Sequence, residues 1–281
     1  MAVLKNKRTQ SSLEYERAFM ELYEHCKQKT MRLPRRRHET LAKPIMDIMN
    51  RAYVHVMNIQ FLPVRGRGYM EVKYREISKA LEIIVEIEKP IMVFWGISGD
   101  KEATELKHQK NSSREYWAEL TNRSINLLQA LERSNPNHAE DTAPPNPVVY
   151  FTDKEIASSQ FLTLTRKILR ITHTRYIRLP VEMRDAEMAS LLWLANDAFY
   201  HAVCGNKFIP RTKQEYEKRR EHISKCIACL NNMNRVMLGV FASEKLSEKQ
   251  MAEWAETLAD ALEISYRVQN SDKKRFERLA R

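Results

Sequence analysis

The sequence MRLP at residues 31–34 returns as IRLP at residues 177–180, which lies 146 positions later in the chain. Proline disfavours helical backbone at the residue before it and cannot donate a helical hydrogen bond, so each Leu-Pro predicts the abrupt end of a helix. The same separation relates further identical pairs: Asn50 and Asn196, Ala52 and Ala198, His55 and His201, Ile77 and Ile223, Ser78 and Ser224, Lys79 and Lys225. Identities held in register over this length indicate a tandem duplication of one module.

Apolar residues repeat with helical spacing in both copies of the module. One stripe comprises Ile77, Leu81, Ile84, Ile87 and Ile91, and its counterparts are Ile223, Ile227, Leu230, Met233 and Met237. Steps of three and four residues are typical of a helix with one buried face. Only six glycines in 281 residues also favour helix over irregular structure. The sequence therefore predicts an all-α fold of two tandem up-down-up-down four-helix bundles.

We expect four helices in each copy. In the first copy they span residues 11–31, 40–60, 69–95 and 112–133, and in the second copy residues 158–177, 185–205, 213–241 and 247–270. The predicted domains are residues 1–133 and 152–281, joined by a proline-rich linker at residues 134–151. Pro90 stands where the second copy has Val236, so the third helix of the first copy should bend or break near Glu86.

The formal net charge of +11 points to a polyanionic partner, because neutralising phosphates releases condensed counterions. No apolar run is long enough to span a bilayer, and the first residues do not resemble a signal peptide. The four cysteines have no disulfide-framework spacing, which is typical of reduced thiols in a cytoplasm. We therefore expect a cytoplasmic protein that binds nucleic acid and not a membrane.

Basic residues cluster near the predicted helix ends. The candidate nucleic-acid-binding residues are Arg35, Arg36, Arg37, Arg65, Arg67, Lys207, Arg211, Lys213, Lys218, Arg219, Arg220, Lys273, Lys274 and Arg275, and Arg278 and Arg281 extend the last cluster. Two interpretations of these clusters stay open. They contact the phosphates of an extended polyanion, or they are solvated turns that keep a basic protein soluble.

His201, Cys204, Cys226 and Cys229 have the residue types of a zinc site in HxxC and CxxC spacing. Cys226 directly precedes a residue of the apolar stripe, so packing in the core is the favoured interpretation and no metal or cofactor is predicted. The chain also lacks the sequence signatures of a phosphate-binding loop, a zinc protease or a serine hydrolase. We therefore predict no enzymatic activity.

The paired histidines His55 and His201, with Asn50 and Asn196, also have two interpretations. They contact RNA or a partner protein, or each closes a hydrogen bond to a neighbouring helix or turn. The second is favoured, because partly buried polar groups require hydrogen-bond partners in any case.

A helix that stops at [IV]-x-L-P, an aromatic-bearing second helix, a Lys/Arg-rich turn and a striped third helix together resemble a known bacterial four-helix-bundle family. That family includes the proteins encoded in 23S ribosomal RNA intervening sequences and the accessory variability determinant of diversity-generating retroelements. In the second copy the pattern is carried by IRLP at residues 177–180, then Leu191, Leu192, Ala195, Phe199 and Ile223 onward. The first copy follows it less closely.

The resemblance implies a non-enzymatic basic protein of a mobile genetic element that binds nucleic acid, RNA in preference to DNA, and assists a reverse transcriptase. The accessory determinant assembles as a ring of five single bundles, and this chain departs from it by joining two. An alternative function is a protein–protein scaffold that binds an acidic partner or forms a homo-oligomer through the outer faces of its bundles.

Overall fold

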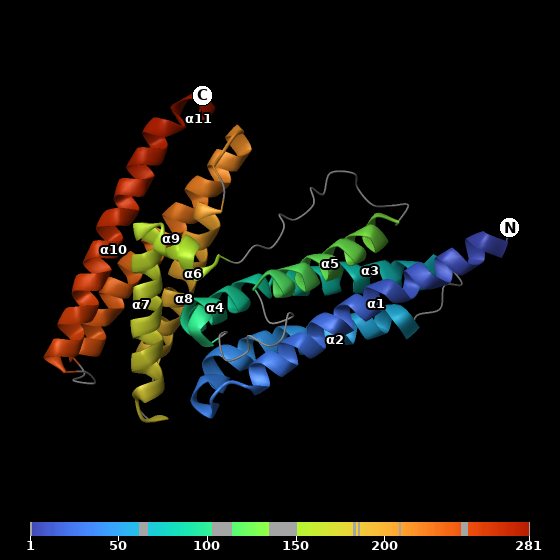
Figure 1. The fold of residues 1–281 in the computed structure, drawn as a ribbon, viewed down its shortest axis with the longest axis horizontal. Coiled ribbons are helices and arrows are strands. Elements are labelled where there is room, and N and C mark those ends of the chain that lie inside the picture. The colour runs from blue at the N-terminus through green and yellow to red at the C-terminus, as the bar shows by residue number, and fades with distance from the viewer. Residues whose placement is uncertain are drawn as a thin grey trace. The chain divides into compact units, whose positions relative to one another are not determined.

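The computed structural model describes residues 2–61, 67–102, 114–134, 151–181, 184, 186–207, 209–242 and 247–280, and its regular elements are all helices (Figure 1). The predicted all-α fold is confirmed over this part of the chain. Nearly all of the predicted linker lies outside the described residues. Contacts divide the chain into two compact units, each of which is treated separately below.

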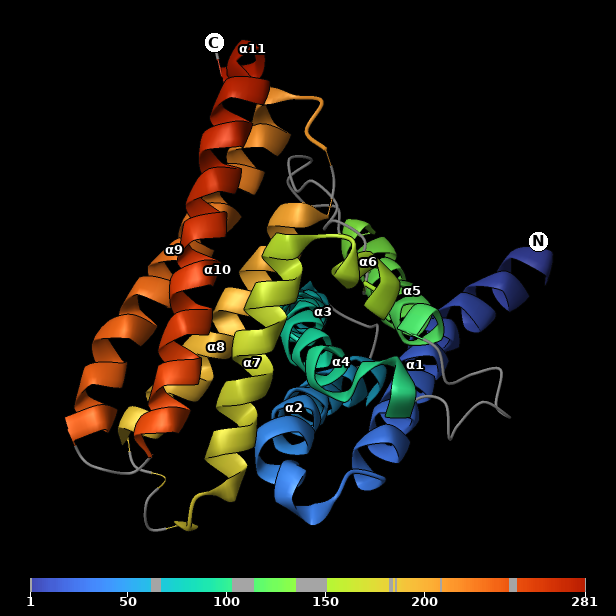
Figure 2. The same cartoon turned by 60° about the vertical axis from the view of Figure 1, so that its left-hand side comes forward.

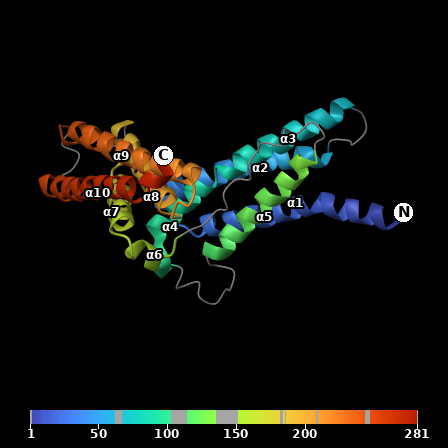
Figure 3. The same ribbon diagram turned by 90° about the horizontal axis from the view of Figure 1, so that it is seen from above.

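Unit 1 consists of the described residues up to Ile91 together with one later helix. Its main helices are α1 (Ala2–Met31), α2 (Lys43–Phe61), α3 (Arg67–Val85) and α5 (Arg114–Arg133). Helix α1 contacts α2 and α5, and α3 contacts the same two helices, which closes a ring of four (Figure 3). Hydrogen bonds from Asn58 to Glu76 and from Arg51 to Glu86 show that α2 and α3 are antiparallel.

Unit 2 consists of residues 92–102 and the described residues from Phe151 onward. Its main helices are α7 (Gln160–Arg178), α8 (Ala186–Asn206), α9 (Lys213–Ala242) and α10 (Glu248–Arg275), with the short helices α6 (Asp153–Ala157) and α11 (Glu277–Ala280). They close a ring in the same cyclic order, in which α7 contacts α8 and α10 and α9 contacts the same two (Figure 2).

Equivalent residues of the two units make equivalent contacts after the Leu-Pro sequences. In unit 1, a ring nitrogen of His38 lies 2.8 Å from the carbonyl oxygen of Leu33. In unit 2, Nε of Arg184 donates to the carbonyl oxygen of Leu179 over 3.1 Å. Both pairs are related by the separation of 146 positions. Two different side chains thus close the same corner of the backbone, as a duplication would produce.

The expected interruption of the third helix of the first copy is confirmed. Helix α3 ends at Val85, and α4 (Glu88–Glu102) begins after a two-residue turn at Glu86 and Ile87. Pro90 explains the break, because it has no N–H to donate to the carbonyl of Glu86 and its ring crowds that carbonyl. The equivalent helix α9 has Val236 there and is continuous.

The compact units differ from the domains predicted from the sequence, because residues 92–102 group with unit 2. Gly96 lies so close to α7 and α8 that a Cβ atom on it would be 2.6 Å from Phe199 and 2.8 Å from Leu169. The Nε atoms of Arg166 and Arg170 both donate to the Gly96 carbonyl, over 2.8 and 3.0 Å. After Pro90 interrupts the helix, α4 therefore packs at Gly96 against the first two helices of the second copy.

Candidate nucleic-acid interface

One end of unit 2 brings together the end of α8, the start of α9 and the end of α10. Arg219 joins them, because it donates to both carboxylate oxygens of Asp272 over 2.6 and 3.2 Å and to the carbonyl of Gly205. The side chains of Arg219 and Asp272 are only 12% and 11% exposed. Arg219 was predicted to contact phosphate, but its guanidinium is occupied within the unit and holds three helix ends in place.

A capping box fixes the start of α9. The Glu215 carboxylate accepts hydrogen bonds from the backbone N–H groups of Arg211 and Thr212, and Thr212 Oγ1 accepts from the N–H of Glu215. The bond from the Arg211 N–H is the main cause that lowers the pKa of Glu215. This arrangement fixes the backbone that carries Arg211 and Lys213.

Exposed cations surround this end of the unit. We call this surface the basic end of unit 2, and it comprises Arg211, Lys213, Lys218, Arg220, Lys273, Lys274, Arg275 and Arg278. Lys207 is half-buried and has a partner of its own. The exposed carboxylates Glu217, Glu221 and Glu277 share the surface but are fewer than the cations. All but two of the residues predicted in the second copy therefore form one exposed positive surface.

A groove of about 450 Å³ crosses the basic end between α9 and α10. Arg220 and Lys273 lie on it from the two helices, and the polar side chains of Ser224, Gln269 and Asn270 line it further along. Gln269 donates to the hydroxyl of Ser224 over 3.2 Å. Asp272, which is paired with Arg219, and Glu277 also line the groove. The groove thus places two cations beside neutral hydrogen-bonding groups and two carboxylates.

The corner after the first Leu-Pro carries a second basic cluster, in unit 1. Arg35 and Arg36 are exposed on a short 3-10 helix, η1 (Arg35–Arg37), whereas Arg37 is half-buried and has a partner. Arg32 is also exposed, and its place directly before Leu33 and Pro34 adds a third exposed arginine that the sequence clusters did not include. Arg65 lies outside the described residues, and the structure places Arg67 only as the first residue of α3.

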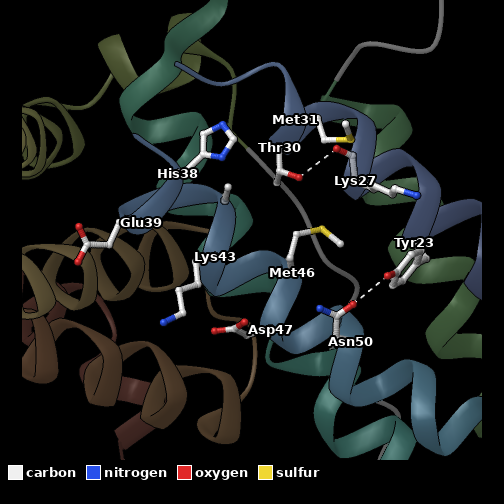
Figure 4. A pocket seen from close by; sticks show the side chains of 11 residues that line it. Tyr23, Lys27, Thr30, Met31, His38, Glu39, Lys43, Met46, Asp47 and Asn50 are labelled. Carbon is white, nitrogen blue, oxygen red and sulfur yellow. Dashed lines mark hydrogen bonds between the residues drawn. The ribbon is translucent and has the colours of Figure 1, made fainter. Parts of the chain in front are cut away.

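Beside this corner, α1 and α2 form a groove of about 530 Å³ (Figure 4). The thioethers of Met31 and Met46 lie on it, and Lys27 and Lys43 come from the two helices. Met31 is 69% exposed. Glu39 and Asp47 also line the groove, so it combines apolar side chains with charges of both signs. Arg35 and Arg36 are not part of its lining.

His25 is a half-buried residue of α1. Its ring contacts Tyr116 and Trp117 edge-on, and its Nε2 atom has no hydrogen-bond partner among the described residues. Burial, followed by the charges of Lys29 and Arg32, lowers the pKa of His25 from 6.5 to about 4. The folded state therefore disfavours the protonated form that the unfolded chain adopts below about pH 6.5.

This histidine predicts that acid destabilises unit 1. Between about pH 6.5 and 4 the unfolded chain binds a proton that the folded chain does not, so the unfolding free energy should fall by about 2–3 kcal/mol on this account. The difference between wild type and His25→Gln, from urea unfolding at a series of pH values, isolates this contribution. Above pH 7 the difference should be constant, and parallel curves throughout would contradict the assignment.

The paired histidines of the two copies bond to neighbouring helices. In unit 1, Nδ1 of His55 lies 2.8 Å from a carboxylate oxygen of Glu76 on α3. In unit 2, Nδ1 of His201 lies 3.0 Å from Nδ1 of His222 on α9, and Glu76 and His222 are themselves 146 positions apart. Burial raises the pKa of Glu76, but hydrogen bonds from Asn58 and His55 outweigh it and lower the pKa. The favoured structural interpretation is confirmed for both histidines.

The paired asparagines behave in the same way. Asn50 accepts a hydrogen bond from the Tyr23 hydroxyl over 2.8 Å, and Oδ1 of Asn196 lies 2.8 Å from Nε2 of His173. Each asparagine thus joins the second helix of its unit to the first. These four paired residues are contacts within the units and do not add to the basic surfaces.

The cysteines that suggested zinc lie within unit 2. Cys204 and Cys226 are buried and Cys229 is half-buried, and burial raises the pKa of the Cys226 thiol. Over the described ranges, no group of three or more His, Cys, Asp or Glu side chains is arranged to hold a metal ion. The same part of the chain contains no helix with the length and apolarity needed to cross a bilayer.

Comparison with known proteins identifies no relative from which a function could be transferred. No family model, curated protein or solved structure matches this chain.

Proposed function

We propose that this chain is a non-enzymatic nucleic-acid-binding protein whose main contact surface is the basic end of unit 2. The observation that carries the proposal is the exposure of cations from α9, α10 and α11 around a groove, on a backbone that the buried pair of Arg219 and Asp272 holds in place. A fixed backbone reduces the conformational entropy that its cations lose when they bind phosphates. The Leu-Pro corner of unit 1, with Arg32, Arg35 and Arg36, supplies a second contact.

The family resemblance supports RNA as the ligand and a reverse transcriptase as the protein partner. Phosphate contacts alone do not distinguish RNA from DNA. The neutral groups of Ser224, Gln269 and Asn270 in the groove are of the kind that contact bases or a 2′-hydroxyl. We therefore propose single-stranded RNA as the first ligand to test.

The test is a variant that removes three cations from the basic end, Arg220→Gln, Lys273→Gln and Lys274→Gln. Binding of labelled single-stranded RNA should weaken roughly 10- to 100-fold in about 0.1 M salt, and the slope of log K against log salt should become shallower by about 2. Fluorescence anisotropy over a salt series gives both values. The same series with DNA of equal sequence measures the preference for RNA.

The matched control removes three exposed cations from other parts of unit 2, Lys154→Gln, Arg235→Gln and Lys249→Gln. It changes the net charge by the same amount, so it should leave the salt slope within experimental error of the wild-type slope. Equal losses in the two variants would show that general charge and not the basic end carries the affinity. Affinity that does not depend on salt, or no binding to any nucleic acid, would refute the proposed function.

A second candidate function is protein–protein assembly, which was the alternative from the sequence. Large apolar side chains are exposed in both units, and they include Met31, Tyr53, Val54, Trp193 and Leu238. Scattered exposed apolar residues are ordinary, but residues placed on a surface that is covered elsewhere in the same fold are informative. Tyr53 and Leu238 are in such positions, because their counterparts in the other copy are covered.

A further inference from the structure

In unit 2, a helix contributed by the first repeat covers the surface between the first two helices of the second repeat. Gly96 of α4 lies against Leu169 of α7 and Phe199 of α8. Met92, one turn earlier in α4, is only 3% exposed. We call the surface between the first two helices of a copy the accepting surface. We call the segment that follows the apolar stripe of the third helix, here residues 92–96, the donated segment.

The equivalent accepting surface in unit 1 lies between α1 and α2. Tyr23 and Tyr53 stand 146 positions before Leu169 and Phe199. Their rings are 5.5 Å apart, and Tyr53 also lies against the buried Phe19 at 6.5 Å. Tyr53 is nevertheless 38% exposed and the adjacent Val54 is 54% exposed. The counterparts of two covered residues thus form an aromatic surface that is partly open to solvent.

The equivalent donated segment lies at the end of α9. Residues 92–96 of α4 correspond to residues 238–242, with Leu238 at the position of Met92 and Ala242 at the position of Gly96. Leu238 is 70% exposed, although Met237 and Val240 on either side of it are buried in the core of unit 2. One side of the end of α9 is therefore free to contact another surface without leaving its own bundle.

We propose that a second copy of this chain covers the accepting surface of unit 1 with the end of its own α9. Within one chain, the donated segment of the first copy covers the accepting surface of the second copy. The accepting surface of unit 1 and the donated segment at the end of α9 remain exposed at Tyr53 and Leu238. A second copy brings both unused halves together in a head-to-tail contact that buries Tyr53 and Leu238. The proposal rests on the duplication and not on the proposed nucleic-acid binding.

The contact between copies should be weaker than the one within unit 2. Arg166 and Arg170, which hold the carbonyl of Gly96, correspond to Met20 and Glu24 in unit 1. Ala242 also carries the Cβ atom that Gly96 lacks, so the end of α9 cannot approach the accepting surface as closely as α4 approaches α7 and α8. Without the charge-assisted hydrogen bonds and this close approach, burial of apolar area is the main favourable contribution. We expect reversible association at micromolar concentrations, which is typical of small interfaces.

Sedimentation of the full-length protein over a concentration series tests the proposal. The wild-type mass should rise above that of one chain, whereas Tyr53→Glu and Leu238→Glu should each stay monomeric. An equimolar mixture of these two variants should form a species of two chains, because each retains the half that the other has lost. A heterologous contact predicts this complementation, whereas a symmetric contact made of one surface does not.

Val72→Glu and Ile209→Glu are the controls, because they place the same charge at exposed apolar positions elsewhere in the two units. Both should associate like the wild type. Circular dichroism checks that each variant is folded, and Tyr53→Ser replaces Tyr53→Glu if the latter loses helix. A wild-type chain that stays monomeric at about 100 µM, a mixture that does not associate, or controls that lose association would each overturn the proposal.

Discussion

Replacing Arg219 by methionine is expected to lower the free energy of unfolding of unit 2 by about 3 kcal/mol. The substitution leaves the carboxylate of Asp272 in a site only 11% exposed, where it has lost both hydrogen bonds from the guanidinium. It also removes the bond to the carbonyl of Gly205, so the ends of α8, α9 and α10 lose their common partner. Faster amide hydrogen exchange in peptides from α9 and α10 would report this local loss within the full-length chain.

A double variant separates the structural role of Arg219 from a direct contact with phosphate. Arg219→Met combined with Asp272→Leu removes both buried charges and should recover most of the lost stability. If Arg219 only positions the helix ends, RNA affinity should recover together with stability. Stability that recovers while affinity stays low would mean that Arg219 itself contacts the ligand. A single variant within about 0.5 kcal/mol of wild type would contradict the role assigned to the pair.

Replacing Gly96 by alanine is the second change with a large expected effect. The new methyl group would lie 2.6 Å from Phe199 and 2.8 Å from Leu169, so both side chains must move or α4 must leave the surface. Overpacking of this kind costs about 1–3 kcal/mol, whereas alanine in an unconstrained helix would be favourable by up to about 1 kcal/mol. The sign of the change therefore distinguishes close packing from helix propensity. Hydrogen exchange in peptides that cover α4 is the measurement.

Gly239→Ala is the matched control for this experiment. Gly239 is also within a helix, but the nearest atom to its added methyl group is a carboxylate oxygen of Glu187, at 3.0 Å, at the end of a flexible side chain. We expect no loss of stability there, because Glu187 can adjust its side-chain torsions. Similar destabilisation by both substitutions would show that α4 is not held by close approach at Gly96.

The sequence was sufficient for the features that depend on local pattern. The duplicated Leu-Pro stops, the apolar stripes and Pro90 predicted an all-α chain, its repeated corners and the break after Val85. These features follow from backbone chemistry and helical period, which neighbouring residues determine. Equivalent histidines could also be assigned to packing, because a duplicated polar contact recurs at a fixed separation.

The surface against which α4 packs and the role of Arg219 could not be predicted from local sequence patterns. Pro90 specifies that the helix breaks, but which surface the next segment covers depends on contacts with Leu169 and Phe199, more than 70 residues away. Likewise, nothing near Arg219 in the sequence distinguishes it from the exposed Arg220, because its partner Asp272 lies 53 residues later. A cluster of charged residues in a sequence therefore does not show which of its side chains form ion pairs within the fold and which are exposed.

The packing of α4 within unit 2 has a consequence for any fragment that contains the second copy alone. A gene fragment that began at the linker would encode four complete helices and yet leave Leu169, Phe199 and the guanidinium groups of Arg166 and Arg170 without the segment that covers them. A fragment that starts after the linker is therefore expected to expose apolar surface that the full chain buries, and so to unfold or aggregate more readily than the full chain.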